Sequence, residues 1–288
     1  MSYITGMKTA GLMALLIAVL MGLCALIGGA EYVIFGLVMG VVMNFFVYWY
    51  SDKLVLRMTH AVPADPMQYG KLHEIVGRLS GKAGMPKPSV YVIEDSRPNA
   101  FATGRGPGHA AVAVHTGLLG RLTDLEVEGV LAHEITHIKN RDILISTVSA
   151  VIAGAISYIT WILLWFGGGR SRSDYGLILA ILAWIMAPIA AMLIQMAISR
   201  SREYSADLGG AKLSNPLRLA FALEKIDASV AVNPKREGNQ ALEQMYIINP
   251  FKGVRFESLF STHPSTKDRV ERLRGWGNKK KCIYTSFV

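Results

Sequence analysis

Residues 131–138 contain two histidines and a glutamate whose spacing is typical of a metal-dependent hydrolase. His133 lies four residues before His137, so on a helix of 3.6 residues per turn both imidazoles face one side and can bind one metal ion. Glu134 would not ligate the metal. We expect it to take a proton from a water held there as the water attacks a carbonyl, and then to give the proton to the leaving amine. The segment predicts a zinc-binding helix that carries its own general base.

The residues before this segment support a helix. Thr123 and Glu126 have the spacing of a capping box, in which each side chain satisfies a backbone N–H at the start of a helix. The competing interpretation is an exposed amphipathic helix with two incidental histidines, and a third ligand elsewhere in the chain would argue against it.

A candidate third ligand lies in the charged cluster at 200–207. Zinc hydrolases with two histidines need one more protein ligand, usually a carboxylate, and keep the fourth position for water. Glu203 is that candidate, because the apolar stretch before it would return the chain to the side of the membrane where the histidines lie. Asp207 lies four residues later on the same helical face and could hold a ligand histidine through its other ring nitrogen. The alternative is a solvated charge cluster at the end of a helix.

Four long uncharged stretches must position these residues, namely 9–30, 32–51, 143–169 and 175–199. A run of about 20 residues crosses a hydrocarbon layer of about 30 Å. The first stretch is too long for a typical signal peptide, and a second follows almost at once, so we expect four transmembrane helices. The alternative, a buried core helix, applies most to the second stretch.

Charge predicts the orientation of these helices. Residues 52–142 carry 11 Lys and Arg, and residues 200–288 carry 16, whereas only Glu31 separates the first two stretches. By the positive-inside rule, both termini and both polar segments are expected in the cytoplasm. The predicted organisation is therefore 1–51, two transmembrane helices; 52–142, a cytoplasmic catalytic part with the zinc helix; 143–199, two further transmembrane helices; and 200–288, a second cytoplasmic catalytic part.

The segment 52–142 also predicts a small sheet. Val, Ile and Ala dominate 90–94 and 110–115, while the glycines and prolines of 97–108 favour a loop or an irregular edge. An exposed edge here would suit an extended peptide, since strand addition satisfies its backbone hydrogen bonds; a plain hairpin is the alternative. Helices are expected before 84, over 216–226 and after Pro264, with a frayed tail from Gly275.

Composition excludes several other classes. The chain is 51% hydrophobic, carries a net charge of +9 and has a mean hydropathy of +0.33. Such apolar content is not that of an ordinary soluble domain, and membrane topology and anionic lipid account for the positive charge without a nucleic acid partner. Cys24 and Cys282 are too few for a zinc knuckle or a disulfide framework.

In the order of its motifs, nearly the whole chain resembles the HtpX family of membrane zinc metalloproteases, relatives of the CAAX prenyl endopeptidases. The matching segments are the paired N-terminal apolar stretches, N-A-F-A-T-G at 99–104, H-E-I-T-H-I at 133–138, R-E-Y-S-A-D at 202–207 and S-T-H-P at 261–264. The resemblance implies an α-helical membrane protein whose mainly α, gluzincin-like catalytic domain carries a small β-sheet.

The resemblance also implies roles for individual residues. Glu203 would be the third zinc ligand and Asp207 its supporting partner, while Asn99 and His263 would approach the substrate or stabilise the oxyanion. One departure is Arg141, at a position where the family often has a small residue such as glycine.

These observations predict a membrane-integrated zinc endopeptidase with one Zn²⁺ per chain, which cleaves damaged or misfolded membrane proteins on the cytoplasmic side. The oligomeric state is left open. A CAAX-type prenyl-protein endopeptidase is the nearest alternative. The other is a non-enzymatic membrane scaffold with structural zinc, for which His115 or His263 would supply the fourth ligand.

Overall fold

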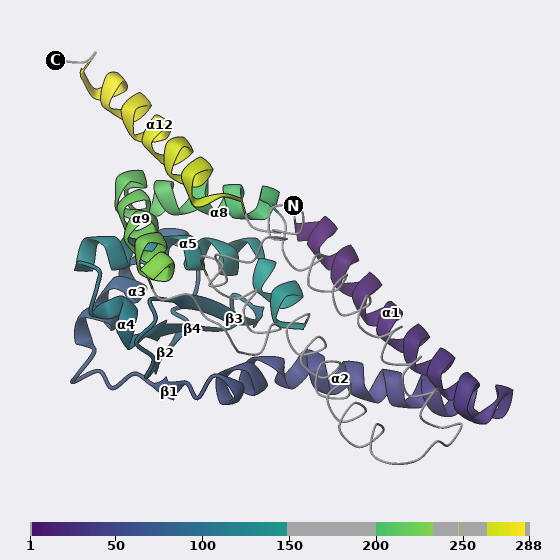
Figure 1. Cartoon of the computed structure of the whole chain (residues 1–288). Helices are drawn as coiled ribbons and strands as arrows, with labels where there is room; N and C mark the ends of the chain where they lie inside the picture. Colours follow the sequence, from purple (N-terminus) through teal and green to yellow (C-terminus); the bar gives the residue numbers. More distant parts are fainter. Residues whose placement is uncertain (1, 149–199, 233–246, 248–263, 286–288) are drawn as a thin grey trace.

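The computed structural model describes residues 2–148, 200–232, 247 and 264–285. This part of the chain is mainly helical with one four-stranded sheet, as Figure 1 shows. The predicted mixture of helices and a small sheet is confirmed. Most of the third and all of the fourth predicted transmembrane stretch, 149–199, lie outside the described residues.

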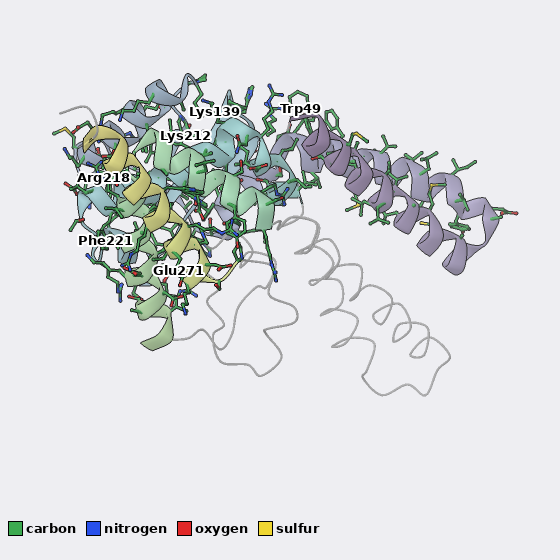
Figure 2. All side chains as sticks on the ribbon, turned by 90° about the horizontal axis from the view of Figure 1, so that it is seen from above. Trp49, Lys139, Lys212, Arg218, Phe221 and Glu271 are labelled. Atoms are coloured by element: carbon green, nitrogen blue, oxygen red, sulfur yellow. The ribbon has the colours of Figure 1, made fainter. Side chains whose placement is uncertain are left out.

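Two long helices form the N-terminal part: α1, Ser2–Gly28, and α2, Val33–Met58, joined through the short 3-10 helix η1, Ala30–Tyr32. They lie side by side and project from the rest of the described protein in both views (Figures 1 and 2). Within the described residues, one helical stretch, Ala30–Met58, has the length and composition to cross a membrane, and the apolar helical stretch Thr9–Gly22 is shorter. Of the four predicted transmembrane helices, the described residues thus supply one candidate.

Small residues set the contact between α1 and α2. Gly36, Gly40 and Asn44 are buried at four-residue intervals along one face of α2. A Cβ on Gly36 would lie 2.8 Å from the backbone of Leu20, so the two helices approach too closely for any larger residue there. Asn44 Nδ2 donates to the carbonyl of Met13 across the same contact, over 2.9 Å. Much of the remaining surface of α2 exposes large apolar side chains, among them Phe35, Phe45 and Trp49.

The sheet has the strand order β1-β2-β4-β3. β1, Val62–Pro63, is antiparallel to β2, Ser89–Ile93, which runs parallel to β4, His109–His115; the edge strand β3, Ala100–Gly106, is antiparallel to β4. The predicted strands at 90–94 and 110–115 are therefore confirmed. The glycine-rich segment between them is an edge strand with a register shift between Gly104 and Gly106, which agrees with the predicted irregular edge.

The helix α5, Asp124–Asn140, lies at the centre of the described fold and packs against α3, Gly70–Ala83, α8, Arg200–Leu213, α9, Pro216–Val232, and strand β3. The predicted capping box is present: Thr123 accepts from the Glu126 N–H, and Glu126 accepts from the Thr123 N–H. α5 ends at Asn140, where Arg141 has a left-handed backbone with φ 61°. The short helix α4, Thr116–Leu119, connects β4 with the start of α5.

The C-terminal helix α12, Thr266–Thr285, packs on α9 and α8 (Figure 2). The predicted fraying from Gly275 is wrong, since the helix continues past that residue. Trp276 packs against the main core and Gly277 lies close to Leu217 of α9, so tertiary packing outweighs the weak helix propensity of the two glycines.

Candidate metal centre

Three side chains from two helices converge beside the sheet. His133 and His137 come from α5 and Glu203 from α8. One donor atom from each lies within 4.8 Å of the other two. The two Nε2 atoms are 3.2 Å apart, and Glu203 Oε1 lies 3.4 Å from Nε2 of His137. Glu203 Oε2 lies 3.7 Å from Nε2 of His133.

The chemistry of this donor set fits a zinc ion. Two imidazole nitrogens and one carboxylate are the usual three protein ligands of catalytic zinc, which keeps a position open for water or substrate. Each histidine directs its Nε2 towards the cluster and its Nδ1 towards a carboxylate, which fixes the tautomer that leaves Nε2 free to bind a metal. Among the described residues, these three side chains form the one group of His, Cys, Asp and Glu arranged in this way.

Two glycines let α8 lie against α5. A Cβ on Gly210 would be 3.0 Å from the backbone nitrogen of His133, and a Cβ on Gly209 would overlap the side chain of Thr136. The close approach brings Glu203 and Asp207 of the same helix to the histidines. Neither glycine was singled out in the sequence, because their effect depends on the helix that faces them.

Asp207 contacts His133 as the spacing of α8 predicts. Its Oδ1 lies 2.9 Å from His133 Nδ1, and both side chains are about 2% exposed. Burial alone would raise the pKa of Asp207, but Arg269 and His133 outweigh it and lower the pKa to about 2. Asp207 is therefore an ionised acceptor for the His133 N–H.

The corresponding partner of His137 is Asp142, which sequence reasoning missed. Its Oδ2 lies 3.2 Å from His137 Nδ1. Because α5 ends at Asn140 and Arg141 reverses the backbone, Asp142 turns back towards a histidine five residues earlier. On an uninterrupted helix, the residue five positions after His137 would not lie on the same face as His137. Predicting this contact from the sequence would therefore have required predicting where the helix ends.

Glu134 lies buried between the histidines and strand β3, with 6% of the residue exposed. Burial raises the pKa of its carboxyl group, while the histidines and the Ala102 N–H oppose the rise. A carboxylate with a raised pKa, beside the metal donors and at the edge of a sheet, is suited to accept and release a proton.

Arg269 is a second residue that sequence reasoning missed. It lies on α12, is 2% exposed, and makes hydrogen bonds to both oxygens of Asp207. Its Nη1 also lies 3.5 Å from Glu203 Oε2. Burial by itself raises the pKa of Glu203, but His137 together with the charges of Arg269 and His133 holds that pKa well below its usual range. No spacing in the sequence links Arg269 to residues on another helix.

Asn99 is fully buried at the start of β3, and its amide contacts another part of the chain. Its Oδ1 accepts a hydrogen bond from the backbone N–H of Ile247 over 3.1 Å. The Ile247 carbonyl accepts from Arg269 Nη1 over 3.0 Å. Asn99 Nδ2 has no hydrogen-bond partner among the described residues. Asn99 is thus linked to the metal centre through Ile247 and Arg269.

The two histidines considered as fourth ligands have different outcomes. His115 belongs to a separate cluster, where its Nδ1 lies 3.7 Å from Asp95 and burial lowers its pKa to about 4. His263 lies outside the described residues, so its predicted role stays a prediction. Pro264, the next residue, is buried.

The predicted exposed edge for a peptide is wrong in one respect. β3 is the edge strand, but residues 100–104 are buried. The Ala102 N–H interacts with Glu134, and Thr147 Oγ1 lies 3.4 Å from the Gly104 N–H. Arg105 at the end of the strand stacks over the Trp49 ring of α2 at 4.1 Å. Other elements satisfy backbone groups that an open edge would leave unpaired.

A helix with two histidines in H-E-x-x-H spacing, joined by a glutamate from a second helix, is the arrangement of a metalloprotease. Comparison with known proteins agrees and is more specific. Residues 66–277 match Peptidase family M48, and the chain belongs to this family.

Relatives of similar length carry one name, "Protease HtpX homolog". The chain is 50% identical over 277 residues to the protein of Thermococcus sibiricus, covering 93% of this chain and 94% of the relative. It is 52% identical over 273 residues to that of Pyrococcus furiosus, covering 93% and 94%. For Paraburkholderia phytofirmans the identity is 48% over 273 residues, covering 92% and 95%. Membership in a protease family supports an enzyme over a non-enzymatic scaffold.

The fold is also similar to a solved structure, the crystal structure of S. mikatae Ste24p. The TM-score is 0.50 at 19% sequence identity, and the match covers 94% of this chain and 66% of that longer protein. At this identity the likeness concerns the fold alone.

Proposed function

We propose that this chain is a membrane-integrated zinc endopeptidase that hydrolyses damaged or misfolded membrane proteins on the cytoplasmic side. The observation that carries the proposal is the convergence of His133, His137 and Glu203 beside the buried carboxylate of Glu134. The apolar stretch Ala30–Met58, with its exposed large side chains, supports a place in the bilayer. We retain the division into 1–51, 52–142, 143–199 and 200–288 as part of this proposal.

His133, His137 and Glu203 would hold the zinc ion. When bound, zinc supplies Lewis acidity, which polarises a peptide carbonyl and makes water a better nucleophile at neutral pH. Asp207 and Asp142 hold the two imidazoles by their Nδ1 atoms, so that both rings keep the orientation in which Nε2 faces the cluster.

Glu134 is the proposed general base. Its carboxylate accepts the proton of the attacking water and then delivers it to the amine that leaves. The raised pKa of Glu134 makes its carboxylate a stronger proton acceptor than that of an exposed glutamate, which favours the first step. The Ala102 N–H holds the carboxylate at the side of β3 where a peptide would approach.

A peptide that binds in an extended conformation would lie along β3. The Ala102 and Gly104 N–H groups already face Glu134 and Thr147, so such a peptide is proposed to pair with other backbone groups of the strand. Backbone pairing of this kind recognises extended or unfolded chain with little regard to sequence, which suits substrates that have lost their fold. Asn99 and His263 are proposed to contact the substrate or the oxyanion, as the family resemblance implies.

The decisive experiment is cleavage of casein by the detergent-purified full chain, with bound zinc measured on every sample. Glu134→Gln is expected to keep its zinc and to lose about 10²- to 10⁴-fold in kcat, because it removes proton transfer alone. Glu128→Gln makes the same chemical change on the same helix, away from the cluster, and should retain activity.

Two other outcomes would replace the proposal. Full activity of Glu134→Gln would remove the proposed base. Zinc bound by an inactive wild type that unfolds on zinc removal would make the site structural. A farnesylated C-terminal peptide in the same assay tests the prenyl-protein endopeptidase: cleavage of that peptide, with casein left intact, would favour it. Cleavage of a misfolded membrane protein in proteoliposomes tests the substrate class and the proposed side of the membrane.

A further inference from the structure

Arg269 is a buried cation on α12, whereas the proposed zinc ligands lie on α5 and α8. A guanidinium stays charged in a protein, and burying it without partners costs several kcal/mol. Arg269 is 2% exposed and among the largest fully buried side chains of the described protein. The fold therefore has to supply anionic or polar partners to this side chain.

Those partners belong to the metal centre. Arg269 Nε donates to Asp207 Oδ2 over 2.9 Å, and Nη2 donates to Asp207 Oδ1 over 2.7 Å. This paired geometry fixes the plane of the carboxylate as well as its position. Asp207 Oδ1 is the same atom that lies 2.9 Å from Nδ1 of His133. The orientation of the carboxylate towards the histidine is thus set by the arginine behind it.

The charges around the two histidines also indicate that Arg269 supports Asp207. The carboxyl groups of Glu134, Glu203 and Asp207 lie close to the two histidines, and like charges gathered in one place repel each other. Arg269 contacts Asp207 and lies 3.5 Å from Glu203. Arg202, also buried, interacts instead with Asp142 and Glu203. Arg269 is therefore the cation that neutralises the carboxylate behind His133.

We propose that Arg269 is a positioning residue of the metal centre: it holds Asp207 where that carboxylate accepts the His133 Nδ1–H and leaves Nε2 to the metal. The inference rests on the proposed zinc site. It makes the C-terminal helix α12 part of the centre, although α12 supplies none of the three proposed ligands. Arg269 Nη2 also lies 3.5 Å from Nδ1 and 3.4 Å from Nε2 of His133, so the double-mutant cycle below separates this direct contact from the action through Asp207. Arg269 has no assigned contact with substrate.

The test compares Arg269→Met and Arg269→Lys with wild type by chelator-competition titration of zinc and by the absorption spectrum of the cobalt-substituted protein. Arg269→Met is expected to weaken zinc binding by about 10- to 100-fold and to alter the cobalt spectrum, because His133 loses its fixed orientation. Arg269→Lys keeps the charge but cannot bond both oxygens with one rigid fork, so its loss should be smaller. Arg274→Met, on the same helix and paired with exposed Glu224, is the matched control and should leave both measurements unchanged.

A double-mutant cycle with Asp207→Asn asks whether Arg269 acts through Asp207. Arg269→Met combined with Asp207→Asn should bind zinc no more weakly than the worse single variant, because both changes remove the same support. Losses that multiply, or wild-type affinity and spectrum in Arg269→Met, would overturn the inference. If Arg269→Met does not fold, Arg269→Lys and the double variant, which has no unpaired charge at this site, decide the matter by the same criteria. These measurements need no substrate, so a failure of proteolysis in wild type is distinguished from a failure of this inference.

Discussion

The two histidines of the metal centre are supported in different ways. His133 is almost fully buried, and its partner Asp207 comes from another helix, 74 residues away in sequence. The side chain of His137 is 15% exposed, and its partner Asp142 follows five residues later. Arg269 donates hydrogen bonds to both oxygens of Asp207, whereas Asp142 interacts electrostatically with Arg202 of α8.

The two histidines therefore depend on different parts of the fold for their orientation. The support of His133 exists only when α5, α8 and α12 have packed together, so the orientation of this ring depends on tertiary structure. The direct partner of His137 comes from the end of α5 itself, although Arg202 of α8 also interacts with this carboxylate. Loss of tertiary packing should therefore affect His133 first and His137 later.

The strongest way to break this comparison is to neutralise each carboxylate in turn. Asp207→Asn is expected to weaken zinc binding by about 100-fold and Asp142→Asn by about 10-fold. Asp207→Asn also removes the carboxylate that bonds buried Arg269 at two positions and leaves Glu203 at 3.5 Å, which should cost about 3 kcal/mol in the free energy of unfolding. Zinc titration and thermal unfolding of both variants measure the two effects. Equal losses for the two variants would show that the histidines are supported alike.

A change on α5 away from the cluster tests whether packing and metal binding can be separated. Glu128 is buried and accepts from Arg78 over 2.9 Å and from Ser214 over 3.0 Å. Glu128→Gln is expected to lower the free energy of unfolding by about 2 kcal/mol at pH 7 while leaving zinc affinity unchanged. A drop in zinc affinity as large as that of Asp207→Asn would show that the two ends of α5 act together.

The same residue predicts a pH dependence. Burial alone raises the pKa of Glu128, but the bonds from Arg78 and Ser214 outweigh it, so the pKa in the folded state lies below its ordinary value of 4.5. The stabilisation is therefore complete above pH 4.5 and is lost as the pH falls through the lower folded-state pKa. Unfolding curves of wild type and Glu128→Gln from pH 7 to 3 should differ most at pH 7 and converge in acid. A constant difference would contradict the assignment.

The smallest effect is expected at the end of α5. Arg141 has a φ of 61°, a conformation that costs an L-residue about 1 kcal/mol and glycine nothing. After the extra entropy of glycine in the unfolded chain, Arg141→Gly should stabilise the protein by about 0.5 kcal/mol. Lys139→Gly, two residues earlier on the exposed side of the helix (Figure 2), should instead destabilise it by about 1 kcal/mol. If both variants changed the free energy of unfolding in the same direction, the left-handed conformation of Arg141 would be contradicted.

The sequence was informative wherever a contact follows from spacing on one helix. The shared face of His133 and His137 and the four-residue step from Glu203 to Asp207 are of this kind, and the structure brings these four residues together. The resembling family often has glycine where this chain has Arg141, and the left-handed backbone at Arg141 explains why, because glycine adopts that conformation without strain.

Contacts that depend on how separate elements pack were missed. Arg269 reaches Asp207 from a helix 62 residues further on, and no periodicity relates the two. The buried edge of β3 was expected to be open, because the groups that cover it come from Glu134 and Thr147 on other segments. Asp142 was missed because the sequence left open whether the helix ends near Asn140, and it is this end that turns Asp142 towards His137.

The turn at Arg141 has a mechanical consequence. Residues 142–148 form a new helical segment, and its first residue, Asp142, is bonded to the ring of His137. A tilt or shift of that segment is therefore transmitted to one imidazole through a single contact of 3.2 Å, while the other imidazole stays anchored by α8 and α12. Movement of this segment would therefore act directly on His137, and on β3 through Thr147.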